Sequence, residues 1–77
     1  MEVNVRDWNS YAKSVLKAEM ARRQVNAPEL VQKLEELGIE DNARNVANKI
    51  ARGSFSAAFL FQCLAAMEVK NLHLGED

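Results

Sequence analysis

Apolar residues recur at three- and four-residue spacing through the first third of the chain. This spacing predicts an amphipathic helix over about residues 7–23, with Trp8 as its anchor in the core. Glu19 falls inside the apolar arc, roughly 20° from Trp8 when each residue turns the helix by about 100°. A carboxylate in that position needs a partner, and Arg23 or an arginine of the third helix could supply it. The apolar set is Trp8, Tyr11, Ala12, Val15, Leu16 and Met20.

Residues typical of a helix start and a helix end predict a second helix over about residues 26–38. Asn26 can cap a helix, Pro28 suits the first turn, and Glu29 stands at the capping-box position. Gly38 suits the left-handed residue that commonly ends a helix. The apolar stripe between these signals consists of Leu30, Val31, Leu34 and Leu37.

The third predicted helix has two clearly different faces. It begins near Asp41 or Asn42, either of which can cap it, and Gly53 ends it. With Arg44 set to zero, one face covers an arc from 0° to about 140° and is entirely polar, while the apolar residues fall between about 200° and 300°. The polar face comprises Arg44, Asn45, Asn48, Lys49 and Arg52, and the apolar face comprises Ala43, Val46, Ala47 and Ile50.

The stretch from residue 55 to residue 67 is apolar almost all round. Ser54 or Ser56 can cap a helix there, and Gln62 is its main polar interruption. A helix without a solvated face is either central to the core or covered by another subunit. Residues 3–5 and 69–74 alternate like strands, so the chain termini could form a short ribbon.

Two short amphipathic helices separated by a turn are the outline of a helix-turn-helix, here over about residues 26–52. The sequence therefore predicts one all-α domain of four helices spanning residues 1–77, with a short terminal β-strand as a possible addition. A chain of 77 residues cannot hold more than one domain. So short a chain buries a limited core, and this favours a homodimer.

Composition excludes several functions. The single Cys63 is expected to act as a small hydrophobe, and His73 as an exposed residue of the tail. No nucleophile, base or metal set converges, so we expect no enzyme, no metal and no cofactor, and no small-molecule substrate is evident. The absence of an apolar stretch of about 18 residues argues against a membrane partner, and the unpaired cysteine suits a reducing, cytoplasmic location.

Charge along the chain is segregated. The net charge is −1, which gives no general attraction to a polyanion. Acidic residues nevertheless gather away from the basic ones, so a weakly basic face could exist on a nearly neutral protein. The acidic set is Glu35, Glu36, Glu40, Asp41, Glu76 and Asp77, and the basic set near the motif is Arg22, Arg23, Arg44, Lys49 and Arg52.

Three segments carry a resemblance to a known family. Residues 25–34, the pair Gly38-Ile39 and residues 46–53 together resemble the lambda-repressor-like helix-turn-helix family. That family has a capped helix with an E-L-A-x-x-L core, a turn of Gly and a hydrophobic residue, and a helix ending in I-x-x-I-x-x-G. The resemblance implies a four-helix fold in which the second motif helix contacts DNA.

A closer resemblance covers nearly the whole chain. Residues 8–13, 19–23 and 52–59 are similar to a family of small bacterial proteins of unknown function to which the same fold is attributed. The connection between residues 38 and 46 is longer than the usual turn. The lambda-repressor-like family has a Glu where this chain has Ala51, so the usual ion pair could be reversed, with Glu19 holding an arginine of the third helix.

Two functions are open at this point. The first is sequence-specific binding of double-stranded DNA by a homodimer in transcriptional control, because Arg and Asn side chains match the edges of G and A. Bases or nearby phosphates would be contacted by Arg44, Asn45, Asn48 and Lys49, and the backbone by Arg22, Arg23 and Arg52. The second is a protein–protein or self-association module without DNA binding, with the polar strip as an ordinary solvated surface. The residues expected at a dimer interface are Phe55, Phe59, Leu60, Leu72 and Leu74.

Overall fold

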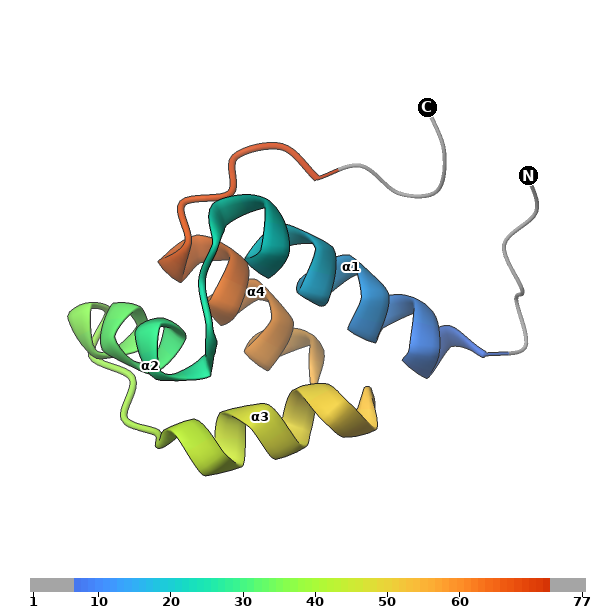
Figure 1. Cartoon of the computed structure of the whole chain (residues 1–77), viewed down its shortest axis with the longest axis horizontal. Helices are drawn as coiled ribbons and strands as arrows, with labels where there is room; N and C mark the ends of the chain where they lie inside the picture. Colours follow the sequence, from blue (N-terminus) through green and yellow to red (C-terminus); the bar gives the residue numbers. More distant parts are fainter. Residues whose placement is uncertain (1–6, 73–77) are drawn as a thin grey trace.

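The computed structural model describes residues 7–72 and confirms an all-α domain. Its four helices are α1 (Trp8–Arg23), α2 (Ala27–Glu36), α3 (Ala43–Arg52) and α4 (Ala57–Ala66) (Figure 1). Residues 69–72, the part of the expected terminal ribbon that the structure describes, contain no strand. The rest of that ribbon, including His73 and Leu74, lies outside the described residues.

The first two helices begin at side-chain caps, of which the sequence analysis predicted the one at α2. Asp7 caps α1 by accepting a hydrogen bond from the Ser10 N–H at 3.1 Å. At α2 the capping box is complete: Asn26 Oδ1 accepts from the Glu29 N–H, and Glu29 Oε1 accepts from the Asn26 N–H, both at 2.9 Å. Such a cap contributes about 1 kcal/mol to helix stability, so these starts are decided locally.

At the next two helices the structure selects one cap from each predicted pair. Asn42 caps α3, where its side chain accepts the Asn45 N–H at 2.8 Å. Ser56 caps α4, where its hydroxyl accepts the Phe59 N–H at 3.0 Å. The fourth helix therefore begins two residues later than Phe55, the start of the apolar stretch.

The core lies where α1 and α2 each pack against both α3 and α4. In Figure 1, α1 crosses above and α3 runs below, with α4 passing behind and α2 closing one end. Helix α2 packs on α3 and α4, and α1 packs on the same two helices. The fully buried side chains come from all four helices, and they are Leu16, Leu30, Leu34, Val46 and Cys63. Burial raises the pKa of the Cys63 thiol to about 12, so this cysteine is the small hydrophobe that the sequence predicts.

The prediction that Trp8 anchors α1 in the core is wrong. Its side chain is 55% exposed and meets Tyr11 edge-on, with ring centroids 5.6 Å apart. Asn9, the next residue of the same turn, lies against Gly53 at the end of α3, so this turn is in contact with the domain while the Trp8 side chain stays outside the contact. Leu16, two turns further on, is the buried anchor of α1.

Helix α3 is tied to α1 at its C-terminal end. Gly53 ends α3 in the left-handed region with φ 75° and is buried. A methyl group on Gly53 would lie 2.6 Å from the carbonyl oxygen of Asn9 and 3.2 Å from Cβ of Lys13. The Lys13 ammonium also donates a hydrogen bond to the Ala51 carbonyl at 3.0 Å. This close approach of two backbones sets how α3 sits on the domain.

Candidate nucleic-acid interface

The polar face of α3 is a surface strip, as its periodicity predicts. We call Arg44, Asn45, Asn48, Lys49 and Arg52 the α3 strip, and all five are exposed. On the opposite face Val46 is 0% exposed and Ile50 is 6% exposed. Because these two residues bracket the buried direction, Asn48 points most directly outward, and the two arginines of the strip lie one helical turn before and after it.

The outward residues of the strip keep their side chains unengaged. Within residues 7–72, no ion pair or side-chain hydrogen bond involves Arg44, Asn48 or Arg52. Glu19 does not hold an arginine of α3, so the reversed ion pair that the sequence suggested is absent from the described part of the chain. Two guanidinium groups and one amide therefore remain available for an external ligand.

Lys49 differs from the other members of the α3 strip. Its ammonium donates a hydrogen bond to Asp41 Oδ2 at 3.0 Å and lies 4.8 Å from the centre of the Phe59 ring. The hydrogen bond from Lys49 is the main reason that the pKa of Asp41 is lowered. Lys49 therefore joins α3 to the connection over residues 37–42 and to α4. The Lys49 ammonium is thus already engaged in contacts that stabilise the fold.

This cluster was not predicted, because no short-range rule detects it. Asp41 and Lys49 are eight residues apart, and Asp41 lies outside the helix, so they are not one of the i,i+3 or i,i+4 pairs that helix geometry brings together. Asp41 also accepts the Asn42 N–H at 2.8 Å. Its charge is thus offset by Lys49, and Glu40 is the exposed carboxylate left at the entrance of α3.

Arg22 and Arg23 belong to a different part of the molecule. Glu19 is 4% exposed, and its Oε2 is 2.8 Å from Arg22 Nη1 while its Oε1 is 3.7 Å from Arg23 Nε. The predicted partner of Glu19 is thus present, although the nearest one is Arg22. These residues lie at the C-terminal end of α1, at the top of Figure 1, whereas α3 runs along the bottom.

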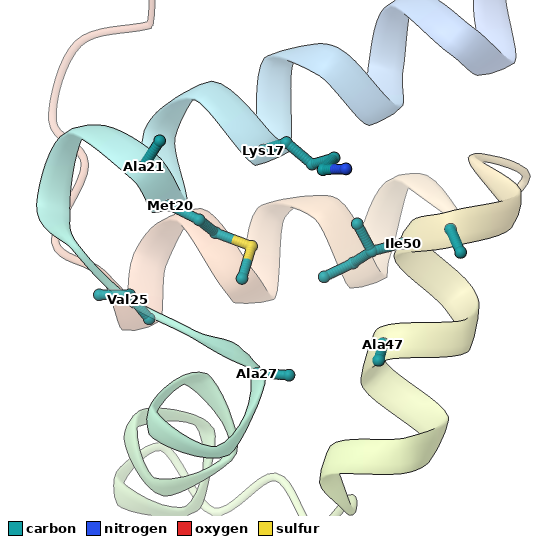
Figure 2. Close-up of a pocket in the computed structure, with 8 residues that line it drawn as sticks. Lys17, Met20, Ala21, Val25, Ala27, Ala47 and Ile50 are labelled. Carbon is teal, nitrogen blue, oxygen red and sulfur yellow. The ribbon is translucent and has the colours of Figure 1, made fainter.

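An apolar groove of about 390 Å³ borders α3 on the side that faces α1. Figure 2 shows Met20 of α1 and Ile50 of α3 extending toward each other across it. One of its eight lining residues, Lys17, is charged. Ala47 and Ala51, which are exposed, form its edge next to the α3 strip. A base or sugar that met the strip would find methyl groups beside it.

Most of the residues expected at a dimer interface pack against the core of their own chain. Phe59 is 6% exposed, and its ring centroid lies 5.4 Å from that of Phe55. Phe55, Leu60 and Leu72 are half-buried against the core. Leu74 lies outside the described residues. Phe61, which the sequence analysis did not single out, is 62% exposed. The exposure of Phe61 could have been predicted from the helical repeat, which places it nearly opposite Phe59 and Cys63 on α4.

Other kinds of site find little support in residues 7–72. No group of three or more His, Cys, Asp or Glu side chains in that range is arranged to hold a metal ion. Within the same range, none of the helices combines the length and the apolar character needed to cross a lipid bilayer.

The fold and its surfaces define a small all-α domain of four helices with one polar, partly cationic helix face. A family model described as a domain of unknown function (DUF6471) matches residues 8–72, and the chain belongs to this family. The expected membership of a family without an assigned function is thus confirmed. Searches of curated proteins and of solved structures give no match.

Proposed function

We propose that this protein binds double-stranded DNA in a sequence-specific manner and acts as a transcriptional regulator, with α3 as the recognition helix of a helix-turn-helix formed by α2 and α3. The observation that carries the proposal is the exposed, unengaged set of Arg44, Asn48 and Arg52 along the outward line of α3. Arg can pair with O6 and N7 of G, and Asn with N6 and N7 of A, in the major groove.

The spacing of these three side chains fits a groove contact. Residues four apart on a helix are separated by about 6 Å along the axis, so the set extends over about 12 Å. That length is comparable with three to four base pairs at about 3.4 Å per step. Buried Val46 and Ile50 hold the helix from behind, which gives the side chains a rigid support.

The contact set is smaller than the sequence suggested. Lys49 is held by Asp41 and Phe59, so we do not place it at the bases or nearby phosphates. The two arginines of α1 are held by Glu19, so we do not place them at the DNA backbone. Asn45 is exposed at the flank of the strip and remains in the set. Within residues 7–72, Arg44 and Arg52 of the α3 strip have no ion-pair partner, so we expect a shallow salt dependence, near a slope of about −2 per bound chain in log affinity against log salt.

The test begins with selection of duplexes from a random pool, followed by titration of the enriched duplex at two salt concentrations. Arg44→Ala is expected to weaken binding by about 1–3 kcal/mol and to relax the preference at one base pair. Lys70→Ala removes the same charge from an exposed residue after α4, so it is the matched control and should leave the preference unchanged.

Two outcomes would overturn the proposal. One is a selection that enriches no sequence together with equal affinity for all duplexes. The other is an Arg44→Ala variant that behaves like Lys70→Ala. The alternative function, self-association without DNA binding, predicts apolar contacts that do not weaken as salt is raised.

A further inference from the structure

Helix α4 exposes a face unlike that of any other helix in the domain. None of its ten residues is charged. The exposed members are Ala57, Ala58, Phe61, Gln62 and Ala65. Four of them, from Ala58 to Ala65, fall within an arc of about 100°. We call Ala58, Phe61, Gln62 and Ala65 the α4 face.

The other helices display charge where they meet solvent. Helix α2 exposes Glu29, Glu35 and Glu36, and α3 exposes Arg44 and Arg52. Contiguous exposed apolar patches commonly mark association surfaces, and on α4 the exposed Phe61 stands between the exposed Ala58 and Ala65. A strongly acidic or basic partner would gain no ion pair on the α4 face, whereas a second uncharged face would lose none.

We propose that the α4 face binds the α4 face of a second copy of this chain, so that the protein forms a two-fold symmetric dimer with α4 antiparallel to its copy. The proposal deepens the homodimer that the sequence predicts for the DNA-binding function, but it rests on α4 alone and does not require DNA binding. In such an interface the same patch must be complementary to itself.

The order of residues along α4 meets this requirement. The midpoint of Ala57–Ala66 falls between Phe61 and Gln62. In an antiparallel pair centred there, Ala58 of one copy lies level with Ala65 of the other, so small residues oppose small residues and the helices can approach closely. Phe61 lies level with Gln62 of the second copy, and its ring packs beside the methylene stem of that glutamine.

Gln62 suits the two-fold axis for a chemical reason. Its amide carries both a donor and an acceptor, so two copies of it can hydrogen-bond to each other without a charged partner. A glutamate or lysine in this place would meet its own charge across the axis. The antiparallel arrangement also places the positive end of each helix dipole beside the negative end of the other.

The size of the face sets the expected strength. Helix α4 is about 15 Å long, so the interface is small and belongs to the class of weak, reversible contacts. The dimer should therefore be concentration-dependent. It should also depend on Phe61, because the largest aromatic side chain near the centre of an interface commonly carries most of its binding energy.

Sedimentation equilibrium of the full chain without DNA, from low micromolar to near-millimolar concentration, tests the proposal. The wild-type mass should rise from monomer toward dimer. Phe61→Glu should weaken self-association by at least about tenfold, because the substitution buries an unpaired carboxylate. Ala65→Glu is a second variant with the same expected effect. Circular dichroism verifies that each variant retains its helices.

Leu37→Glu is the matched control. Leu37 is 50% exposed at the C-terminal end of α2, outside the α4 face, and the substitution adds the same charge at another exposed hydrophobic residue. It should leave the association constant unchanged. A wild-type chain that stays monomeric throughout would overturn the proposal, as would Phe61→Glu and Ala65→Glu variants that dimerise like the wild type, or an equal loss in Leu37→Glu.

The two proposals fail separately. Loss of the dimer in Phe61→Glu leaves the α3 strip intact, so a monomer that still prefers one duplex supports DNA binding without the symmetric pair. A chain that dimerises through α4 and binds no duplex retains the α4 interface and loses the function proposed for α3.

Discussion

The contact between Gly53 and Asn9 makes a quantitative prediction that needs only two substitutions. Gly53 and Gly38 both end a helix segment in the left-handed region, with φ 75° and 81°. They differ in their surroundings. A methyl group on Gly38 would have no atom within 4 Å, whereas one on Gly53 would lie 2.6 Å from the Asn9 carbonyl oxygen. The obstacle is backbone of α1, which cannot rotate away as a side chain can.

The two alanine variants should therefore lose different amounts of stability. An L residue in the left-handed conformation lowers the free energy of unfolding of each variant by about 1–2 kcal/mol. In Gly53→Ala, pushing α3 away from α1 lowers it by about 1–3 kcal/mol more. The expected total is about 2–5 kcal/mol for Gly53→Ala and about 1–2 kcal/mol for Gly38→Ala. A domain of 77 residues has a free energy of unfolding of about 4–12 kcal/mol, so the loss expected for Gly53→Ala is a large fraction of the total.

Urea denaturation followed by helical circular dichroism measures both losses on one scale. The slopes of the two variants should match that of the wild type, because the same surface is exposed on unfolding. If the two variants lose equal free energy, the close approach of α1 and α3 is not a constraint on the fold, and the argument for how α3 is positioned is refuted.

Two further predictions follow from the caps and from the Lys49 cluster. Glu68 follows α4 in the left-handed region with φ 60°, so Glu68→Gly should raise the melting temperature, with a gain of up to about 1 kcal/mol, and a lower melting temperature would contradict the cap assignment. The pKa of Asp41 is held below 3.8 mainly by the hydrogen bond from Lys49, so its stabilisation is complete above that pH and is lost as the pH falls through the folded-state value. In urea titrations, Asp41→Asn should therefore lower the free energy of unfolding by about 0.2–1 kcal/mol at neutral pH, and by a smaller amount when the pH is far below 3.8. A stability difference that does not change with pH would exclude the ion pair as its cause.

Helix starts and helix faces could be predicted from the sequence because they depend on nearby residues. The capping box of Asn26 and Glu29 involves groups three residues apart, and any chain that turns helical there brings them together. The separation of Arg44 and Asn48 from Val46 follows from the helical repeat alone. The sequence therefore predicted four helices, most of their caps, and the exposed strip of α3.

The tertiary structure decided how those side chains are used, because their partners come from elsewhere in the chain. Lys49 meets Asp41 and the Phe59 ring only after α3, its preceding connection and α4 have packed together. Trp8 belongs to the apolar arc of α1 and is nevertheless 55% exposed, because the helices packed against α1, and not residues 7–23 alone, decide which part of that arc is covered. Periodicity assigns a residue to a face of its own helix, and only packing determines what that face meets.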